Sequence, residues 1–295
     1  MSWEFEVLAK PMGLTEGPAW DGSKLLFTNT PNNRVMRYDP QSGALDVART
    51  GTNQANGLNF DQQGRLYACE GGGRRMVRYE PDGGVTVVCD TFEGKRLNSP
   101  NDLAIDRLGR IWFTDPRYGD KRDDMELDHE SVFRLDPQPD GSWRTLRMTY
   151  DTTSPNGLLV TPDMSTLYVA QSKYGEGQER ELRAYPILAD GSLGEYQVLH
   201  NFYPHRGIDG MCLDQDGNIV ATAGWELSGP GGMIYVFAPN GRVLETHPVP
   251  VDRPTNCTFG GADLRTLYVT SIDGQLLRAQ TDRQGWLLYP SIPSV

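Results

Sequence analysis

The chain has 295 residues, a formal net charge of −11 and an isoelectric point near 4.9. An acidic protein of this kind repels phosphate backbones and anionic lipids, so we expect neither nucleic acid nor a membrane as its partner. No apolar stretch reaches the roughly 18 residues of a membrane-spanning helix, and the N-terminus lacks the basic and apolar regions of a signal peptide. We therefore expect a cytoplasmic protein with a single domain over residues 1–295.

Short strand-like runs dominate the chain, and helical periodicity is nearly absent. Six of these runs open with an acidic residue or an asparagine, at intervals of 40 to 55 residues. Each continues into a hairpin, and a second hairpin follows before the next opener. In chain order the six openers are Glu16, Asn56, Asn101, Asn156, Asp209 and Asn256.

Two hairpins per repeat give four antiparallel strands, which is one blade of a β-propeller. The repeats therefore predict an all-β, six-bladed propeller. The last of the second hairpins is expected in the sequence QLLRAQTDRQGWLL, residues 275–288. An open ring would leave an unpaired strand edge, so we expect residues 3–9, WEFEVLA, to supply the outer strand of the blade that begins at Asn256.

The longest irregular segment is the polar stretch RYGDKRDDMELDHE, residues 117–130. Insertions of this length are uncommon without a function, so the alternatives are a solvated surface loop and a lid over the channel mouth. The cysteines form no CxxC pair and stand in strand-like runs, which favours free thiols that pack as small apolar groups. They are Cys69, Cys89, Cys212 and Cys257.

The six openers gain meaning from the predicted ring. Any one of their dipeptides, such as Asn-Gly, is typical of a turn. The first strand of each blade lines the central channel, however, so equivalent positions on all six strands face one axis. Two carboxylates and four amides, with no histidine or cysteine, form a set of hard oxygen donors that suits one divalent cation. Ca²⁺ is the preferred ion, and Mg²⁺, Mn²⁺ and Zn²⁺ are alternatives.

Longer motifs surround these openers and span nearly the whole chain. They are EGP from Glu16, SPNDL at residues 99–103 followed by IWFTDP, SPNGL at residues 154–158, DGM from Asp209 followed by LDQDGN, and PTNCTFGG at residues 254–261. In these motifs the chain resembles the family of gluconolactonase, senescence marker protein (regucalcin) and luciferin-regenerating enzyme. The forms RLNSPNDL and IWFTDP are most similar to those of the bacterial gluconolactonases.

The resemblance implies a six-bladed propeller with one catalytic divalent cation, commonly calcium, in the channel. At the matching positions Glu16, Asn156 and Asp209 would be metal ligands, and Asn101 a further ligand or a substrate contact. Diisopropylfluorophosphatase is similar at these four positions and uses them as a calcium site. A second calcium site, known in some relatives, has no recognisable ligands in this sequence.

Further candidates for substrate binding lie in and near the ring. Asn56 and Asn256 line the ring and are expected to contact substrate rather than the cation. Arg96 and Asn98 precede Asn101, and His205 precedes Asp209, so each is a candidate contact for a polyol at the channel mouth. For these three, a position on a solvated loop is the alternative.

The resulting hypothesis is a lactonase that opens a small sugar-derived lactone to the aldonic acid. The cation would act as a Lewis acid, while Asp209 takes a proton from water or itself attacks the carbonyl. Two alternatives stay open, namely a calcium-dependent phosphotriesterase or promiscuous esterase of the same fold, and a propeller that serves only as a binding platform. The sequence leaves the identity of the lactone and the oligomeric state undetermined.

Overall fold

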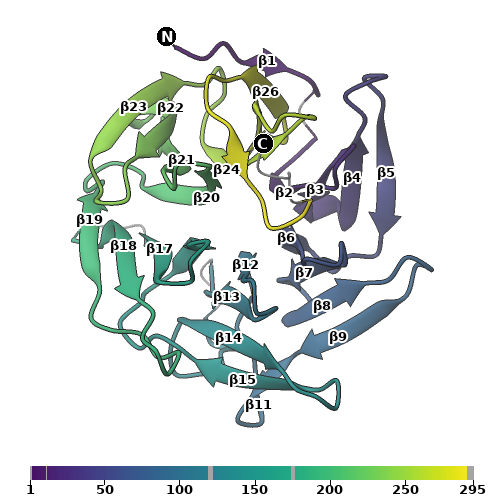
Figure 1. Ribbon diagram of the computed structural model, residues 1–295, viewed down its shortest axis with the longest axis vertical. Coiled ribbons are helices and arrows are strands. Elements are labelled where there is room, and N and C mark those ends of the chain that lie inside the picture. The colour runs from purple at the N-terminus through teal and green to yellow at the C-terminus, as the bar shows by residue number, and fades with distance from the viewer. Residues whose placement is uncertain (1, 11, 119–121, 174–176, 291–295) are drawn as a thin grey trace.

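Six β-sheets stand radially around a central channel in the computed structural model (Figure 1). The structure describes residues 2–10, 12–118, 122–173 and 177–290. Each sheet is antiparallel, and its strands follow one another from the channel outward. The predicted all-β, six-bladed propeller with four strands per blade is confirmed.

The blades take their strands in chain order, except that the sixth blade also uses the N-terminus. From the channel outward, the first blade consists of β2 (Thr15–Trp20), β3 (Leu25–Asn29), β4 (Arg34–Tyr38) and β5 (Leu45–Thr50), and the second of β6 (Ala55–Phe60), β7 (Leu66–Glu70), β8 (Arg75–Tyr79) and β9 (Val85–Cys89). The third blade consists of β12 (Leu103–Ile105), β13 (Ile111–Asp115), β14 (Ser131–Pro137) and β15 (Trp143–Arg147), and the fourth of β16 (Pro155–Val160), β17 (Thr166–Ser172), β18 (Arg180–Pro186) and β19 (Gln197–Asn201). The fifth blade consists of β20 (Ile208–Asp214), β21 (Ile219–Trp225), β22 (Ser228–Phe237) and β23 (Val243–Pro248), and the sixth of β24 (Pro254–Gly260), β25 (Thr266–Ser271), β26 (Leu276–Gln280) and β1 (Glu6–Val7).

Three small elements lie outside this pattern. A two-stranded ribbon pairs β10 (Thr91–Phe92) with β11 (Lys95–Arg96), and β27 (Gly285–Trp286) joins the fifth blade. Among the residues just described, the one helical segment is the 3₁₀ turn η1 (Thr30–Asn32). No helix in this part of the chain is long and apolar enough to cross a membrane.

The outermost strand of each blade is its most exposed strand. Strand β2 is buried along its whole length, whereas β5 at the rim of the same blade is mostly exposed. The reason is that an inner strand packs against inner strands on both sides, and contacts between neighbouring inner strands run around the complete ring. Apolar side chains fill the spaces between blades; Trp20 and Phe27 of the first blade share a core cluster with Phe259 of the sixth.

The N-terminal strand closes the ring, as predicted. In β1, Glu6 pairs with Arg278 and Val7 pairs with Leu277 of β26 (Figure 1). Just before β1, Trp3 is buried and its ring stacks on His247 of the fifth blade with the ring centroids 3.9 Å apart. The first residues therefore join two blades and cover the strand edge that β26 would otherwise expose.

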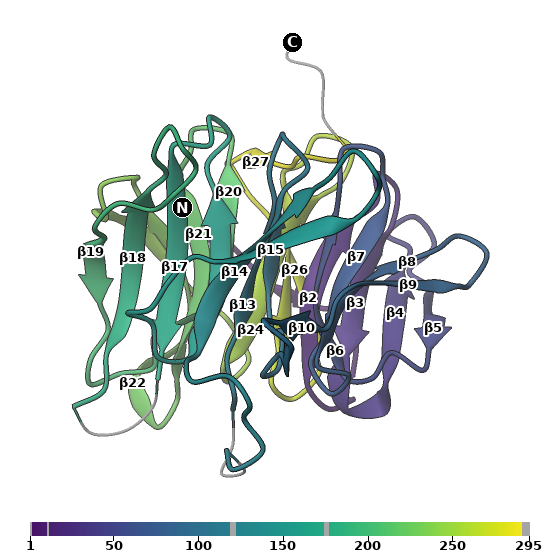
Figure 2. The same ribbon diagram turned by 90° about the horizontal axis from the view of Figure 1, so that it is seen from below.

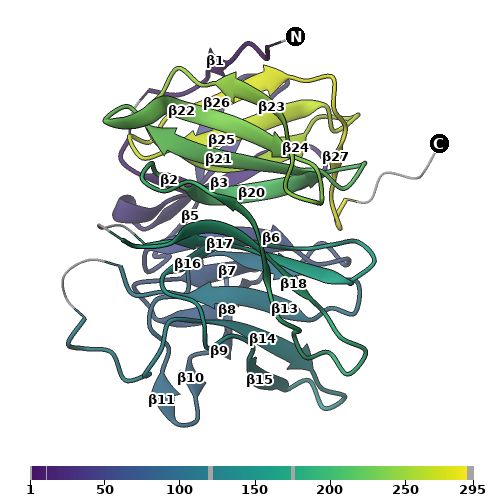
Figure 3. The same cartoon turned by 90° about the vertical axis from the view of Figure 1, so that its left-hand side faces the viewer.

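The hairpin predicted over residues 275–288 is wrong in its second half. Its first strand forms as β26, but Gly285–Trp286 pairs instead with the inner strand of the fifth blade, with Trp286 opposite Leu213 (Figure 3). The physical reason is that β1 already holds the place next to β26. The chain after β27 then crosses one end of the channel, where Leu287, Leu288 and Tyr289 line it.

Candidate active site in the central channel

The openers owe their orientation to irregularities in the inner strands. In five of the six inner strands the register against the second strand shifts at or next to the opener, as at a β-bulge. The remaining opener, Asn101, lies just before β12 and donates its backbone N–H to the carbonyl of Thr114 at 2.9 Å. Bulges re-aim side chains and are frequent beside active sites. In this ring they interrupt the strands at one level of the channel.

The glycines after the openers have a different role from the one their dipeptides suggest. Gly57, Gly157 and Gly210 lie inside strands, and their backbones are not in the left-handed region. A Cβ atom on Gly157 would come within 2.4 Å of the carbonyl oxygen of Asp209, and one on Gly210 within 2.1 Å of the Asn256 side chain. These glycines allow each inner strand to approach the opener of the next blade. The interpretation as turns is therefore wrong for these three positions.

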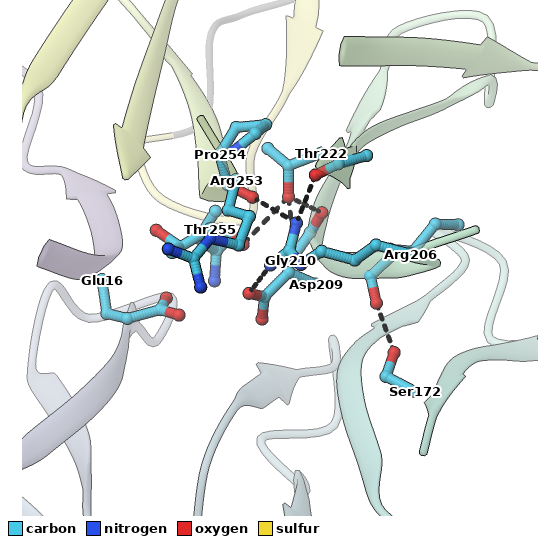
Figure 4. Close-up of polar contacts among 12 residues, drawn as sticks. Glu16, Ser172, Arg206, Asp209, Gly210, Thr222, Arg253, Pro254 and Thr255 are labelled. Atoms are coloured by element: carbon cyan, nitrogen blue, oxygen red, sulfur yellow. Dashed lines mark hydrogen bonds and ion pairs between the residues drawn. The ribbon is translucent and has the colours of Figure 1, made fainter. Parts of the chain in front are cut away.

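Threonine hydroxyls on the second strands hold the irregular segments in place. Thr114, Thr222 and Thr270 each accept a hydrogen bond from a backbone N–H that lies in or just before the inner strand. The donors are Asp102 at 3.1 Å, Gly210 at 3.1 Å and Asn256 at 3.2 Å. Thr222 also donates to the carbonyl of Thr255 at 2.9 Å and so links the fifth blade to the sixth (Figure 4).

Three carboxylates meet at this level of the channel. In Figure 4 the carboxylate of Glu16 points from the left toward that of Asp209 at the centre of the view. Both charges act on one another, and the charge of Asp102 also acts on Glu16. Amides lie beside them: the side chain of Asn156 lowers the pKa of Asp209, and Asn256 Nδ2 donates to Asp102 Oδ2 at 3.2 Å.

The pKa values of these carboxyls reflect burial and mutual repulsion. Burial, followed by the charges of Asp209 and Asp102, raises the pKa of Glu16 well above its ordinary value. Burial also raises the pKa of Asp209, against the opposing effects of Arg206 and Asn156. The pKa of Asp102 rises to about 7, again mainly through burial. Such a cluster favours either bound protons or a bound cation.

Sequence reasoning missed two members of this site, Asp102 and Arg206. Asp102 directly follows an opener in the motif SPNDL, and the one-residue-per-blade pattern passed over it. Arg206 stands three residues before Asp209 and forms an ion pair with it. The signal in the sequence is an arginine three residues before a predicted ligand, next to the candidate His205.

The remaining ring candidates lie in the channel wall. Asn101 is buried, and Asn56 is half-buried in β6, where its carbonyl accepts a hydrogen bond from the Thr28 hydroxyl at 2.9 Å. A cavity of about 100 Å³ continues along the channel from Asp102 and Asn256. The segment after β27 lines its far end, opposite the loop that follows β13 (Figure 2).

The candidates outside the ring lie in different surroundings. Arg96 is exposed, and its side chain is 2.6 Å from Glu126 in an ion pair. Asn98 is buried and donates to the carbonyls of Asp115 at 3.1 Å and His129 at 3.0 Å, so it fixes the loop backbone. His205 is exposed and packs against Gly229. Substrate contact by these residues stays a prediction.

Ion pairs tie down the described parts of the loop over residues 117–130. Arg117 binds Asp124 at 2.6 Å, Arg122 binds Glu130 at 2.7 Å, and the guanidinium of Arg74 from the second blade donates to the carbonyl of Asp124 at 3.1 Å. Residues 119–121 of this loop lie outside the described residues. Whether the loop acts as a lid stays a prediction.

The donor set fits a hard cation only if amides take part. Within the described ranges no three His, Cys, Asp or Glu side chains are grouped as a metal site. Carboxylate and amide oxygens together are the donors that Ca²⁺ prefers, and they surround the acidic pair of Glu16 and Asp209 here. All four cysteines are free and buried, as expected, and belong to the packing.

Comparison with known proteins identifies the family of this chain. Residues 14–273 match the family described as the SMP-30/Gluconolactonase/LRE-like region. The chain belongs to this family. It is 32% identical over 315 residues to a gluconolactonase of Zymomonas mobilis, which covers 97% of this chain and 83% of the relative. It is 30% identical over 272 residues to pentonolactonase XacC of Haloferax volcanii, with 88% and 82% covered.

This chain is also similar to a solved structure of a gluconolactonase. A gluconolactonase from Xanthomonas campestris aligns with a TM-score of 0.81 and 34% identity, over 94% of this chain and 89% of that chain. The resemblance inferred from the motifs is thereby confirmed at the level of the family.

Proposed function

We propose that this protein hydrolyses a sugar-derived lactone to the aldonic acid with the help of one divalent cation in the channel. Two relatives reported above, a gluconolactonase and a pentonolactonase, are named for the hydrolysis of a lactone ring. The observation that supports the metal dependence is the gathering of the buried carboxylates of Glu16 and Asp102 and the partly buried carboxylate of Asp209, with amides beside them.

Glu16, Asn156 and Asp209 are the proposed ligands, with Asn101 as a further ligand or a substrate contact. Oxygen donors alone favour Ca²⁺, with Mg²⁺, Mn²⁺ and Zn²⁺ as alternatives. When bound, the cation would supply Lewis acidity to the lactone carbonyl and stabilise the developing negative charge on its oxygen. The proposed substrate is a small-molecule lactone, as expected for a narrow channel rather than a flat surface.

The protein's own residues supply orientation and proton transfer. Asp209 is held by Arg206, and it is the group proposed to take a proton from the attacking water or to attack the carbonyl itself. Asp102 is the alternative base, because burial brings its pKa to about 7, near the value at which a general base is most effective. The ring oxygen leaves with a proton and becomes the new hydroxyl.

The test is metal analysis of the purified protein, followed by an acid-release assay over pentono- and hexonolactones with and without a chelator. We expect a stoichiometric divalent cation, loss of lactone hydrolysis in the chelator and recovery on adding Ca²⁺. An organophosphate triester in the same panel addresses the phosphotriesterase alternative. Chelator-resistant hydrolysis by a metal-free sample would refute the proposed metal dependence, and preference for the triester would refute the substrate class.

A further inference from the structure

Arg206 is a buried arginine that links two blades at the proposed site. It is 4% exposed and stands two residues before β20. Its Nη1 donates to the carbonyls of Pro254 at 3.1 Å and Gly224 at 3.3 Å, while Nη2 forms the ion pair with Asp209 Oδ2 (Figure 4). Backbone carbonyls of the fifth and sixth blades thus fix the guanidinium that binds the carboxylate of Asp209.

These contacts restrict how Asp209 presents its oxygens. One oxygen is bound by Arg206, whose guanidinium is itself fixed by two backbone carbonyls. A carboxylate bound in this way cannot rotate freely, and a planar guanidinium fixes its direction better than a flexible ammonium would. Asp209 is therefore oriented by its neighbours even before a cation or substrate is present.

The same arginine works against cation binding through its charge. Its charge acts on Glu16 as well as on Asp209, the two acidic ligands proposed above. A positive charge beside the ligands of a dication repels that dication, more strongly in a buried site than in water.

We propose that Arg206 is a positioning residue that fixes Asp209 through one oxygen, improving catalysis while weakening the affinity for the cation. This inference rests on the proposed metal-dependent function. It predicts that loss of Arg206 raises the affinity for Ca²⁺ and lowers kcat. The affinity rises because the repulsion between the arginine and the cation is removed, and kcat falls because the carboxylate of Asp209 is no longer held by the guanidinium. Loss of a merely structural contact would impair both together.

The experiment compares Arg206→Gln and Arg206→Lys with the unmodified full chain. Calorimetry measures the Ca²⁺ affinity of chelator-treated protein. Steady-state assays with a lactone give kcat and KM, and thermal unfolding shows whether each variant is folded. For Arg206→Gln we expect Ca²⁺ affinity at least about tenfold tighter and kcat lower by about 10², the loss typical of a misplaced reacting group. Arg206→Lys keeps the charge, so its affinity should stay within about threefold while kcat still falls.

A matched control is Arg134→Gln. Arg134 is also buried, pairs with Asp136 at 2.6 Å and donates to the carbonyl of Gly191, away from the channel. Its replacement should lower stability without tightening Ca²⁺ binding. Unchanged or weaker Ca²⁺ affinity in folded Arg206→Gln would overturn the role of Arg206 alone. Absence of Ca²⁺ binding by the unmodified protein would instead overturn the proposed function and this inference with it.

Discussion

Asp209 and Asp102 differ in their surroundings although they lie in the same channel. Asp209 forms an ion pair with the guanidinium of Arg206, whereas the side chain of Asp102 is buried and accepts a hydrogen bond from the amide of Asn256. A carboxylate beside a fixed positive charge stays ionised more readily than one that is only desolvated. The structure therefore favours Asp209 as the ionised ligand and gives Asp102 the character of a proton acceptor.

Substitution of these residues should separate their roles. We expect Asp209→Asn to abolish turnover, because it removes both a ligand charge and the proposed base. Asn56→Ala should lower kcat/KM only modestly, since Asn56 is proposed to contact substrate alone. Steady-state kinetics with a lactone would measure both, and near-normal turnover by Asp209→Asn would show that the role assigned to Asp209 is wrong.

The raised pKa values predict how stability depends on pH. The pKa values of Asp102 and Asp115 rise to about 7 in the folded protein through burial, above the ordinary value of 3.8. The folded state then binds more protons than the unfolded state between about pH 4 and pH 7, so these groups stabilise it at low pH and lose that effect as pH rises through 7. Added Ca²⁺ should act oppositely, stabilising more at pH 8 than at pH 5, because it competes with protons.

Thermal unfolding at pH 5 and pH 8, in chelator and in Ca²⁺, would measure this dependence. Asp102→Asn should flatten the pH dependence in chelator, since an amide does not titrate. Stability that increases from pH 5 to pH 8 in chelator, with no change in Asp102→Asn, would contradict the assignment.

At the scale of the element, the irregular start of each inner strand, rather than its regular part, positions the residues of the proposed site. The register shifts free backbone N–H groups, and threonines of the second strand accept them. Thr222 is fully buried and connects Gly210 of its own blade with Thr255 of the next. A similar threonine follows the apolar run of most second strands, so one short pattern supports the ring at several points.

Thr222→Val should test this support. Valine has nearly the same shape but leaves the N–H of Gly210 and the carbonyl of Thr255 without their partner, which destabilises by about 1–3 kcal/mol. Because Gly210 follows Asp209, kcat should fall as well. Thr266→Val, whose hydroxyl contacts only the exposed Gln280 side chain among the described hydrogen bonds, is the control for urea unfolding and kinetics. Equal stability of the two variants would contradict the role given to Thr222.

For the whole molecule, closure of the ring depends on the first residues. Trp3 donates to Asp282 at 2.9 Å and stacks on His247, and β1 completes the sixth blade. Loss of this segment exposes the edge of β26 and removes a buried tryptophan. An exposed edge of this kind invites pairing between molecules.

Deletion of residues 2–9 should therefore lower the melting temperature and promote aggregation. The loss of Trp3 alone is expected to destabilise by about 3–5 kcal/mol, as for other buried tryptophans. Trp3→Ala keeps β1 and serves as the control, since it should melt early without the same aggregation. Calorimetry with light scattering would measure both effects, and a deletion variant that behaves as the full chain would show that the ring closes without its N-terminal strand.

The fold and part of the site were accessible from the sequence for a common reason. Each repeat carries its own strand pattern, and the opener marks the same place in each, so six similar signals predict one ring. The placement of Glu16, Asp209 and Asn156 in the channel follows from that regularity. Asp102 and Arg206 do not recur from repeat to repeat, and periodicity gives no means of finding them.

The sequence by itself determined the number of blades, the family and the level of the channel at which polar side chains gather, because these depend on local patterns repeated along the chain. Only the tertiary structure decided that Gly285–Trp286 joins the fifth blade, that the glycines serve close approach, and that Arg206 binds Asp209. The physical reason is that these features arise where separate blades or chain ends meet, and no local pattern records which surfaces come into contact.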